Sequence, residues 1–283
     1  MMGPSIENIR LSDGYLAAVR WWRRTKEKAS GTSVPAALYF HGIQSHGGWY
    51  EGSGAALASA GYMVLMPDRR GSGLNREQRG HVDSVEAAVG DATDSLNALL
   101  KESNQATAHI VGVSWGGKLA VCLAAAAPRQ VASLTLIAPG LFPVVDLTAP
   151  EKFRVAVSLI NHRDKKFDIP LNDPQFFTDN PERVAFVEKD TLMLRQVTAP
   201  FLLATRRMDR IVGRLNRSGY RGPVHLMLAG KDRIINNERS REWLKNLAFC
   251  PKRLTEYPSA HHTMEFERDT SRFFEDLVSG INQ

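Results

Sequence analysis

The stretch that decides the fold reads His109-Ile110-Val111-Gly112-Val113-Ser114-Trp115-Gly116-Gly117-Lys118. A short β-branched run ends in the pattern G-x-S-x-G, centred on Ser114, and helix-forming residues follow from Lys118 to Ala127. Between a strand and a helix, this pattern makes a sharp turn that holds the serine hydroxyl out of the sheet, where a base can reach it. Gly112 and Gly116 are needed because the turn is too tight for side chains beside the serine. The stretch therefore predicts a nucleophile elbow with Ser114 as the nucleophile.

The same residues allow two other interpretations. Gly112 to Lys118 also spells G-x-x-x-x-G-K, most of a phosphate-binding loop, which would make the chain a nucleotide-binding protein. Position 119 is Leu, however, where such a loop needs a Ser or Thr to bind magnesium. The second alternative is a glycine-rich turn whose serine has no chemical role. The choice depends on whether the rest of the chain supplies a histidine, an acid and an oxyanion hole.

The composition is that of an ordinary globular protein. Of the 283 residues, 43% are hydrophobic and 23% charged, which suffices for one well-packed core. The two cysteines, Cys122 and Cys250, cannot form a disulfide framework. The amino terminus has no apolar leader and no apolar run is long enough to span a membrane, so we expect a cytoplasmic protein. The net charge is +6, but the basic residues are scattered, which argues against a nucleic-acid partner.

Apolar runs and helical patterns alternate on both sides of the elbow. A hairpin is expected over residues 5–22, around Ser12-Asp13-Gly14, and a polar loop over 26–33. Further strands are expected at 35–40, 62–66, 110–113, 131–138, 223–230 and 253–257. Helices are expected at about 54–60, 85–102, 118–127, 238–247 and 267–278. This alternation predicts the α/β class, with a mostly parallel central sheet and helices on both faces.

The alternation stops between Gly140 and about Thr205. Six prolines in this segment separate short helical stretches, such as 153–160 and 181–195. A long insertion between sheet elements is usually functional. We therefore expect a core formed by residues 1–140 and 206–283, with a mainly helical cap inserted at 141–205. The cap segments 161–166 and 172–174 are polar and charged.

A serine hydroxyl becomes a good nucleophile only when an imidazole takes its proton and an acid orients that imidazole. In the chain order that accompanies an elbow, the acid follows a later strand and the histidine comes after it. Asp232 lies two residues beyond the apolar run 224–229 and is the candidate acid. Asp209 is a weaker rival, because it lies in an expected helix. His261 and His262 both follow the last strand, and spacing alone does not choose between them.

An oxyanion hole needs two backbone N–H groups aimed at the developing negative charge. Trp115, the residue after the nucleophile, supplies one of them. The loop after strand 35–40 supplies the other, because Gly42 permits the turn and the Ile43 N–H can act as the donor. We expect His41 to brace this loop rather than to bind a metal, since no further residues show metal-site spacing. The pattern implies no cofactor and no metal.

Taken in order, these motifs resemble the α/β-hydrolase superfamily and, within it, the monoacylglycerol lipases and lysophospholipase-like serine hydrolases. The segments that carry the resemblance are 41–46, 67–73, 112–117, 229–234 and 257–267. Members share the pattern Tyr-x-x-Ala-x-His with a Glu five residues further on. Laid on Tyr257, Ala260 and Glu267, that pattern implies that His262 is the base. One motif departs slightly, since relatives often carry His in place of Ser72.

The resemblance implies a carboxylic ester hydrolase that forms an acyl-enzyme on Ser114, with Asp232 and His262 completing a triad. The expected partner is a small acyl ester: a monoacylglycerol, a lysophospholipid or a similar medium-sized ester. Monoacylglycerol lipases tend to have a strongly apolar cap that docks on membranes, whereas this cap is polar, so the substrate and any transient contact with lipid stay open. Thioester, C–C or peptide bond cleavage and a non-catalytic ligand-binding role on the same fold are the alternatives.

Overall fold

The computed structural model describes residues 3–23, 33–248 and 250–281. A central sheet of eight strands has the order β1-β2-β4-β3-β5-β6-β9-β10. From β4 to β10 all neighbours pair in parallel, whereas β2 runs antiparallel to both β1 and β4. The strands are β1 (Ser5–Arg10), β2 (Leu16–Trp22), β3 (Ala36–Phe40), β4 (Met63–Pro67), β5 (Ala108–Val113), β6 (Val131–Ile137), β9 (Val224–Ala229) and β10 (Lys252–Tyr257). The predicted α/β class and mostly parallel sheet are thus confirmed.

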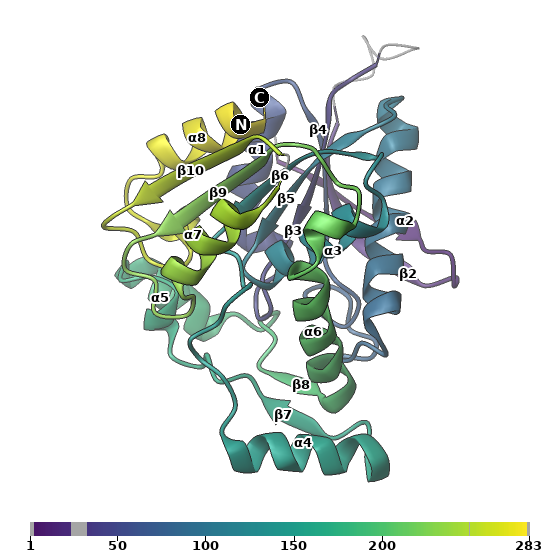
Figure 1. Cartoon of the computed structure of the whole chain (residues 1–283), viewed down its shortest axis with the longest axis vertical. Helices are drawn as coiled ribbons and strands as arrows, with labels where there is room; N and C mark the ends of the chain where they lie inside the picture. Colours follow the sequence, from purple (N-terminus) through teal and green to yellow (C-terminus); the bar gives the residue numbers. More distant parts are fainter. Residues whose placement is uncertain (1–2, 24–32, 249, 282–283) are drawn as a thin grey trace.

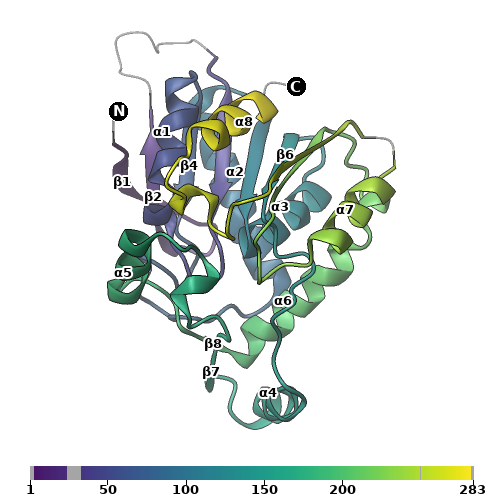
Figure 2. The ribbon, with the colours of Figure 1, turned by 90° about the vertical axis from the view of Figure 1, so that its left-hand side faces the viewer.

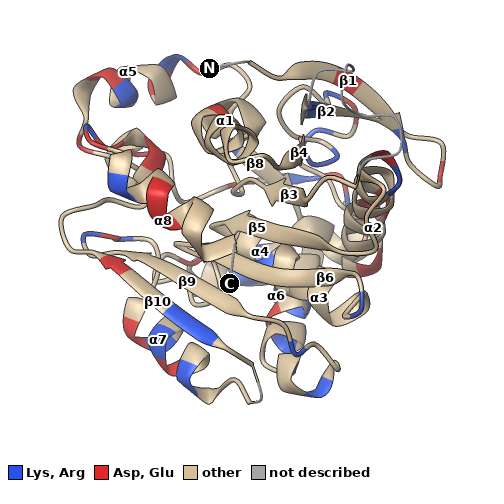
Figure 3. Cartoon of the chain, turned by 90° about the horizontal axis from the view of Figure 1, so that it is seen from above, with Lys and Arg blue, Asp and Glu red and all other residues tan. Residues whose placement is uncertain are grey.

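Helices cover both faces of this sheet, as Figure 1 shows from the front and Figure 3 from above. On one face lie α1 (Glu51–Ser59) and α8 (Ser271–Ile281), and on the other α2 (Val85–Ser103), α3 (Trp115–Ala126) and α7 (Asn237–Asn246). Every residue of the central strands β3, β4 and β9 is buried as a result. This double cover explains why these strands read as continuous apolar runs rather than as alternating ones.

The segment between β6 and β9 forms a cap at one end of the sheet (Figures 1 and 2). Its elements are α4 (Ala149–Asn161), β7 (Lys166–Asp168), α5 (Pro181–Lys189), β8 (Gln196–Thr198) and α6 (Ala199–Val212). The cap is mainly helical, as expected, but β7 and β8 also form a small antiparallel sheet that the sequence did not predict. Strands of three residues are too short to show an alternating pattern. Short 3₁₀ helices occur at η2 (Gly47–Trp49), η3 (Pro174–Phe176), η4 (Leu215–Arg217) and η5 (Met264–Phe266).

Several boundaries differ from those expected. Helix α1 begins at Glu51 rather than at about residue 54, and α5 ends at Lys189 rather than at 195. Helix α8 begins at Ser271 rather than at 267, because the Asp269 carboxylate accepts a hydrogen bond from the Ser271 N–H and starts the helix there. Residue 205 lies inside α6, so the division between core and cap stays a proposal. The expected polar loop at 26–33 lies almost entirely outside the described residues.

The outer surface carries two features that bear on partners. In the view of Figure 3, Lys and Arg are scattered among Asp, Glu and uncharged residues and form no continuous basic stretch. The cap is less polar than its sequence indicated, because α4 exposes Phe153 (70%), Val157 (41%) and Ile160 (84%). In the described ranges, no helix has the length and apolar character needed to cross a bilayer. The cytoplasmic location stays a prediction.

Candidate active site

Ser114 lies between β5 and α3 with φ 53° and ψ −120°, a backbone conformation that non-glycine residues rarely adopt. The two flanking glycines make the turn possible. A Cβ on Gly112 would collide with the backbone of Gly116, and a Cβ on Gly116 would collide with the Phe40 carbonyl. The Ser114 N–H donates to the Ile137 carbonyl at 3.0 Å, which ties the turn to the neighbouring strand. The structure therefore contains the strained strand-to-helix turn that an elbow requires.

Asp232 and His262 face each other at the ends of two neighbouring strands. Asp232 follows β9 and His262 follows β10, and the Asp232 Oδ2 lies 2.7 Å from the His262 Nδ1. The other carboxylate oxygen accepts the backbone N–H groups of Ile234 (2.8 Å) and Ile235 (3.1 Å). Both side chains are almost completely buried. Asp232 therefore orients the imidazole with Nδ1–H toward the carboxylate and leaves Nε2 to accept a proton.

One contact of the expected triad is absent. Within the described residues, no hydrogen bond connects Ser114 with His262. Both nevertheless follow parallel strands, β5 and β10, at the same edge of the sheet. Catalytic hydrogen bonds are often long in unliganded enzymes and tighten when substrate binds.

The rival candidates have other partners. The backbone N–H of His261 donates to the Glu267 carboxylate at 2.7 Å, and the His261 Nδ1 lies 3.0 Å from the same carboxylate oxygen. The Asp209 carboxylate lies 2.5 Å from the Lys118 ammonium. Because Lys118 is paired in this way, its ammonium is not free to bind a phosphate, as a phosphate-binding loop would require. A metal ion could be shared by Asp179, His261 and Glu267, whose ligand atoms lie close together, but the Glu267 carboxylate is already hydrogen-bonded to His261.

The two expected oxyanion donors lie beside Ser114. A Cβ on Gly42 would lie 3.3 Å from the Ser114 Cβ, so the loop after β3 passes directly next to the serine. Ile43, Ser114 and Trp115 line the same cavity. In the part of the chain that the structure describes, neither the Ile43 nor the Trp115 backbone N–H donates a hydrogen bond. Both N–H groups are therefore available to a substrate oxygen.

Buried side chains brace this loop from behind. The His41 Nδ1 lies 2.8 Å from the Gly42 carbonyl, and its Nε2 accepts the Arg69 backbone N–H at 3.0 Å. Burial, reinforced by the Arg69 charge, lowers the pKa of His41 well below its usual value, so the ring is neutral. Asp68 accepts the Gly47 N–H at 2.7 Å, and the Ser72 hydroxyl lies 3.3 Å from the His41 Nε2. Asp68, Arg69 and Ser72 thus support the loop rather than facing the cavity.

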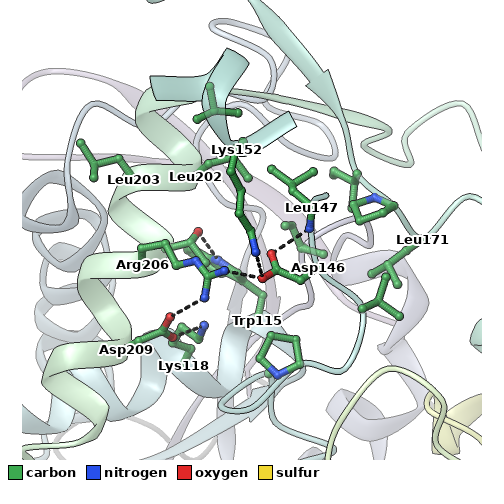
Figure 4. Close-up of a pocket in the computed structure, with 18 of the residues that line it drawn as sticks. Trp115, Lys118, Asp146, Leu147, Lys152, Leu171, Leu202, Leu203, Arg206 and Asp209 are labelled. Atoms are coloured by element: carbon green, nitrogen blue, oxygen red, sulfur yellow. Dashed lines mark hydrogen bonds and ion pairs between the residues drawn. The ribbon is translucent and has the colours of Figure 1, made fainter. Parts of the chain in front are cut away.

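A cavity of about 310 Å³ opens beside Ser114 (Figure 4). Its walls are mostly aliphatic and come from the cap and from the loop after β9. They include Leu147, Val155, Leu159, Leu171, Leu202 and Ile235. An apolar cavity of this size next to the candidate nucleophile suits the hydrocarbon part of a small substrate.

One end of the cavity is charged. Figure 4 shows the ion pairs Lys118–Asp209 (2.5 Å), Arg206–Asp146 (2.5 Å) and Lys152–Asp146 (2.7 Å). Arg206 also lies 3.7 Å from Asp209, so the five side chains form one network. It joins α3 of the core to α4 and α6 of the cap. Each acid in this network already has a cationic partner.

Sequence reasoning missed this network and the contacts of Arg69. Lys118 belongs to the G-x-x-x-x-G-K pattern and Asp209 is the weaker rival acid, but neither pattern indicates that the two side chains pair. Arg69 belongs to the segment 67–73, but nothing in its spacing indicates that its guanidinium contacts the loop after β3. Phe177 was also missed; its ring centroid lies 6.2 Å from that of His262.

The fold is that of an α/β hydrolase. The model of the family described as serine aminopeptidase, S33, matches residues 34–269, and the chain belongs to this family. Within the α/β hydrolases it resembles monoacylglycerol lipase. The monoglyceride lipase of Homo sapiens is 25% identical over 285 aligned positions, which cover 96% of this chain and 88% of that protein. The Mus musculus monoglyceride lipase is 24% identical over 263 positions, 90% of this chain and 82% of that one.

Solved structures confirm the fold. A soluble variant of monoglyceride lipase from Saccharomyces cerevisiae, in complex with a substrate analog, has a TM-score of 0.81 at 16% identity, covering 99% of this chain and 94% of that one. The monoacylglycerol lipase of Paleococcus ferrophilus has a TM-score of 0.77 at 22% identity, covering 88% and 96%. The family description names an aminopeptidase, whereas these relatives are named as lipases.

Proposed function

We propose that this chain is a carboxylic ester hydrolase that forms an acyl-enzyme on Ser114. The observation that carries the proposal is the buried Asp232–His262 pair, which follows β9 and β10 at the sheet edge where the strained Ser114 turn follows β5. Chain order and fold match those of hydrolases that use a Ser-Asp-His triad. The similarity to monoglyceride lipases supports the same reaction class.

In the proposed mechanism, Ser114 Oγ attacks the ester carbonyl while His262 Nε2 takes the hydroxyl proton. Asp232 stabilises the imidazolium through the hydrogen bond to Nδ1. The carbonyl oxygen becomes an oxyanion that the Ile43 and Trp115 N–H groups stabilise. His262 then gives its proton to the departing alcohol, which leaves an acyl group on Ser114. Water attacks this ester in the second half-reaction, again with His262 as the base.

The cavity supports a substrate with an apolar acyl chain. Its aliphatic walls can take the hydrocarbon part, while the charged end is compatible with a polar group on the same molecule. A monoacylglycerol, a lysophospholipid or a similar medium-sized ester meets both requirements. The apolar outer face of α4, with Phe153 and Ile160, supports transient contact between the cap and a lipid surface.

Peptide cleavage is the second candidate, because the family description names an aminopeptidase. An aminopeptidase has to bind the free ammonium group of its substrate, which calls for an unpaired carboxylate near the nucleophile. The acids that line the cavity, Asp146 and Asp209, are both paired with cations. The cavity therefore favours an ester with an apolar chain.

Substrate assays on the purified chain distinguish these possibilities. We expect hydrolysis of p-nitrophenyl esters and monoglycerides of graded chain length, and labelling of Ser114 by a fluorophosphonate. The variant Ser114→Ala should lose both. Cleavage of aminoacyl amides without ester cleavage would favour the peptidase. A folded chain that neither hydrolyses these substrates nor reacts with the fluorophosphonate would be a binding module instead.

The two adjacent histidines provide a matched pair of variants. His262→Gln should lower kcat by about 10⁴-fold or more, because the residue that takes the serine proton is lost. His261→Gln should keep kcat within about threefold, since in the structure His261 pairs with Glu267 and not with Asp232. The measurement is steady-state ester hydrolysis with thermal melting as the folding control. Equal losses in the two variants would contradict the assignment of the base.

A further inference from the structure

A buried guanidinium lies directly behind the loop that carries one of the oxyanion donors. Arg69 comes two residues after β4 and is 7% exposed. Its Nη2 donates to the carbonyl oxygens of Gly42 at 3.1 Å and of Ile43 at 2.6 Å. The guanidinium therefore binds two consecutive peptide groups of the loop that passes beside Ser114.

The first of these contacts is with the peptide group whose N–H is the proposed oxyanion donor. The Gly42 carbonyl and the Ile43 N–H belong to one planar peptide unit, so a hydrogen bond to the carbonyl fixes the direction of the N–H. This carbonyl accepts from both the Arg69 guanidinium and the His41 ring. Hydrogen bonding at the carbonyl also polarises the unit and makes its N–H a stronger donor. A positive charge at this carbonyl therefore strengthens the oxyanion hole from outside it.

The same guanidinium also contacts the residue that carries the second donor. Its central carbon lies 4.7 Å from the ring centroid of Trp115 and 5.5 Å from that of Phe201. The Trp115 indole N–H is in turn bonded to the Thr205 hydroxyl at 2.9 Å. Arg69 thus packs between the Ile43 loop and the start of α3, and it can keep the two backbone donors at a constant separation.

The charge of Arg69 is not neutralised by an ion pair within the described residues. The neighbouring carboxylate, Asp68, instead binds Arg20 at 3.0 Å and the Gly47 N–H. The Arg69 Nε and Nη1 are buried and have no hydrogen-bond partner among the described residues. Burial lowers the pKa of Arg69, and the Asp68 charge partly opposes this effect, but a guanidinium stays protonated even when it is buried. A desolvated, unpaired cation exerts a strong field on negative charge that develops nearby.

We infer that Arg69 is a positioning residue of the oxyanion hole, which orients the Gly42–Ile43 peptide and adds a fixed positive charge behind it. This inference rests on the proposed esterase function. Arg69 exchanges no proton with the substrate and touches no reacting atom. It acts through the two backbone donors, in the transition state where the oxyanion exists, so its loss should affect kcat more than KM.

The groups around Arg69 define its expected pH dependence. The ionisable side chains facing it are His41, which is neutral, and Asp68, which is bound to Arg20. Burial raises the pKa of the nearby Tyr39 and Tyr50, so neither titrates near pH 9. The guanidinium itself stays protonated in the working pH range, so the wild-type kcat should show no alkaline fall that comes from Arg69.

The test compares three variants in ester hydrolysis and in their pH profiles. Arg69→Met should lower kcat by about 10²-fold, the loss typical of one oxyanion donor, with KM changed by less than about threefold. Arg69→Lys keeps a charge and should retain part of kcat, with an alkaline fall that the wild type lacks, because burial lowers the pKa of an ammonium readily whereas a guanidinium stays protonated. The control Arg70→Met removes the adjacent guanidinium, which pairs with Asp91 and Asp13, and should leave kcat unchanged.

The outcomes separate the two proposals. Wild-type esterase activity that Ser114→Ala abolishes, together with a kcat for Arg69→Met near wild type, would overturn the role of Arg69 alone. A KM that rises in Arg69→Met as much as kcat falls would also overturn it. If Arg69→Met does not fold, Arg69→Lys decides: a folded variant with the kcat and the pH profile of the wild type counts against the inference. A wild-type chain without hydrolase activity would refute both proposals.

Discussion

Ser114 holds a backbone conformation that costs about 1–3 kcal/mol, and its surroundings have to compensate for that cost. The Ser114 N–H is bonded to the Ile137 carbonyl, and the Ser114 carbonyl accepts the N–H groups of Gly117 (3.0 Å) and Gly140 (2.6 Å). The turn is thus held by three elements, β6, α3 and the loop after β6. At this scale the function depends on backbone sterics, and the glycines around the serine are the residues to test.

Alanine substitutions test the close packing of the turn. Gly112→Ala and Gly116→Ala should each lower the free energy of unfolding by about 2 kcal/mol or more, because the new Cβ would overlap backbone atoms that cannot rotate away. Gly90→Ala in α2 is the matched control. Gly90 has nothing within 4 Å of an added Cβ, so alanine there should stabilise the chain by about 0.5–1 kcal/mol. Urea unfolding measures all three, and a Gly116→Ala variant as stable as wild type would contradict the prediction.

Among the elements, α6 connects the cap to the core. It begins directly after β8 in the cap and packs against α3, the helix that starts directly after Ser114 (Figure 1). The Lys118 ammonium on α3 is buried, with 3% of the side chain exposed, and its carboxylate partner is Asp209 on α6. A buried charge becomes strongly destabilising when its partner is removed. This pair therefore links the position of the cap to that of the elbow helix.

A double-mutant cycle tests the link between α3 and α6. Asp209→Asn should cost about 3 kcal/mol, because it leaves the Lys118 ammonium buried without a counter-charge. Adding Lys118→Met should restore much of that loss, since no isolated charge remains. Asp146→Asn removes an acid from the more exposed part of the network and should cost less than about 1 kcal/mol. Additive effects of Asp209→Asn and Lys118→Met in thermal or urea unfolding would contradict this account.

At the scale of the whole molecule, Glu265 joins an early segment of the chain to a late one. Its carboxylate accepts the Ser53 backbone N–H at 3.0 Å and the Ser53 hydroxyl at 2.5 Å, between residues 212 positions apart. The side chain is buried between α1 and the segment after His262. Burial raises the pKa of Glu265 to about 7, although the hydrogen bonds from Ser53 oppose the shift.

This shift makes the stability of the whole chain depend on pH. A carboxyl with a raised pKa stabilises the folded state most below about pH 4.5, its usual pKa, and loses that contribution as pH rises through about 7. The wild type should therefore lose stability between pH 5 and pH 8 relative to Glu265→Gln, whose amide does not ionise. Urea unfolding at several pH values measures the difference. Glu256→Gln, on the partly exposed β10, is the control and should run parallel to wild type; a parallel Glu265→Gln profile would refute the prediction.

By itself, the sequence determined the features that depend on neighbouring residues. The elbow at Ser114, the alternation of strands and helices, and the position of Asp232 after β9 all follow from steric and hydrophobic patterns within a few residues. Segment ends were less predictable. Helix α5 ends six residues earlier than expected, where the Asp190 carboxylate binds His46 (3.1 Å) and the Trp49 indole (2.7 Å) of a distant loop.

Only the tertiary structure decided which side chains meet across the fold. His261 and His262 are equivalent by spacing, and the difference between them arises because one ring faces Glu267 and the other Asp232. Likewise, no local pattern places the Arg69 guanidinium on the Gly42 carbonyl, 27 residues earlier in the chain. The physical reason is that local sterics act between adjacent residues, whereas hydrogen bonds, ion pairs and cavity walls depend on how distant segments pack.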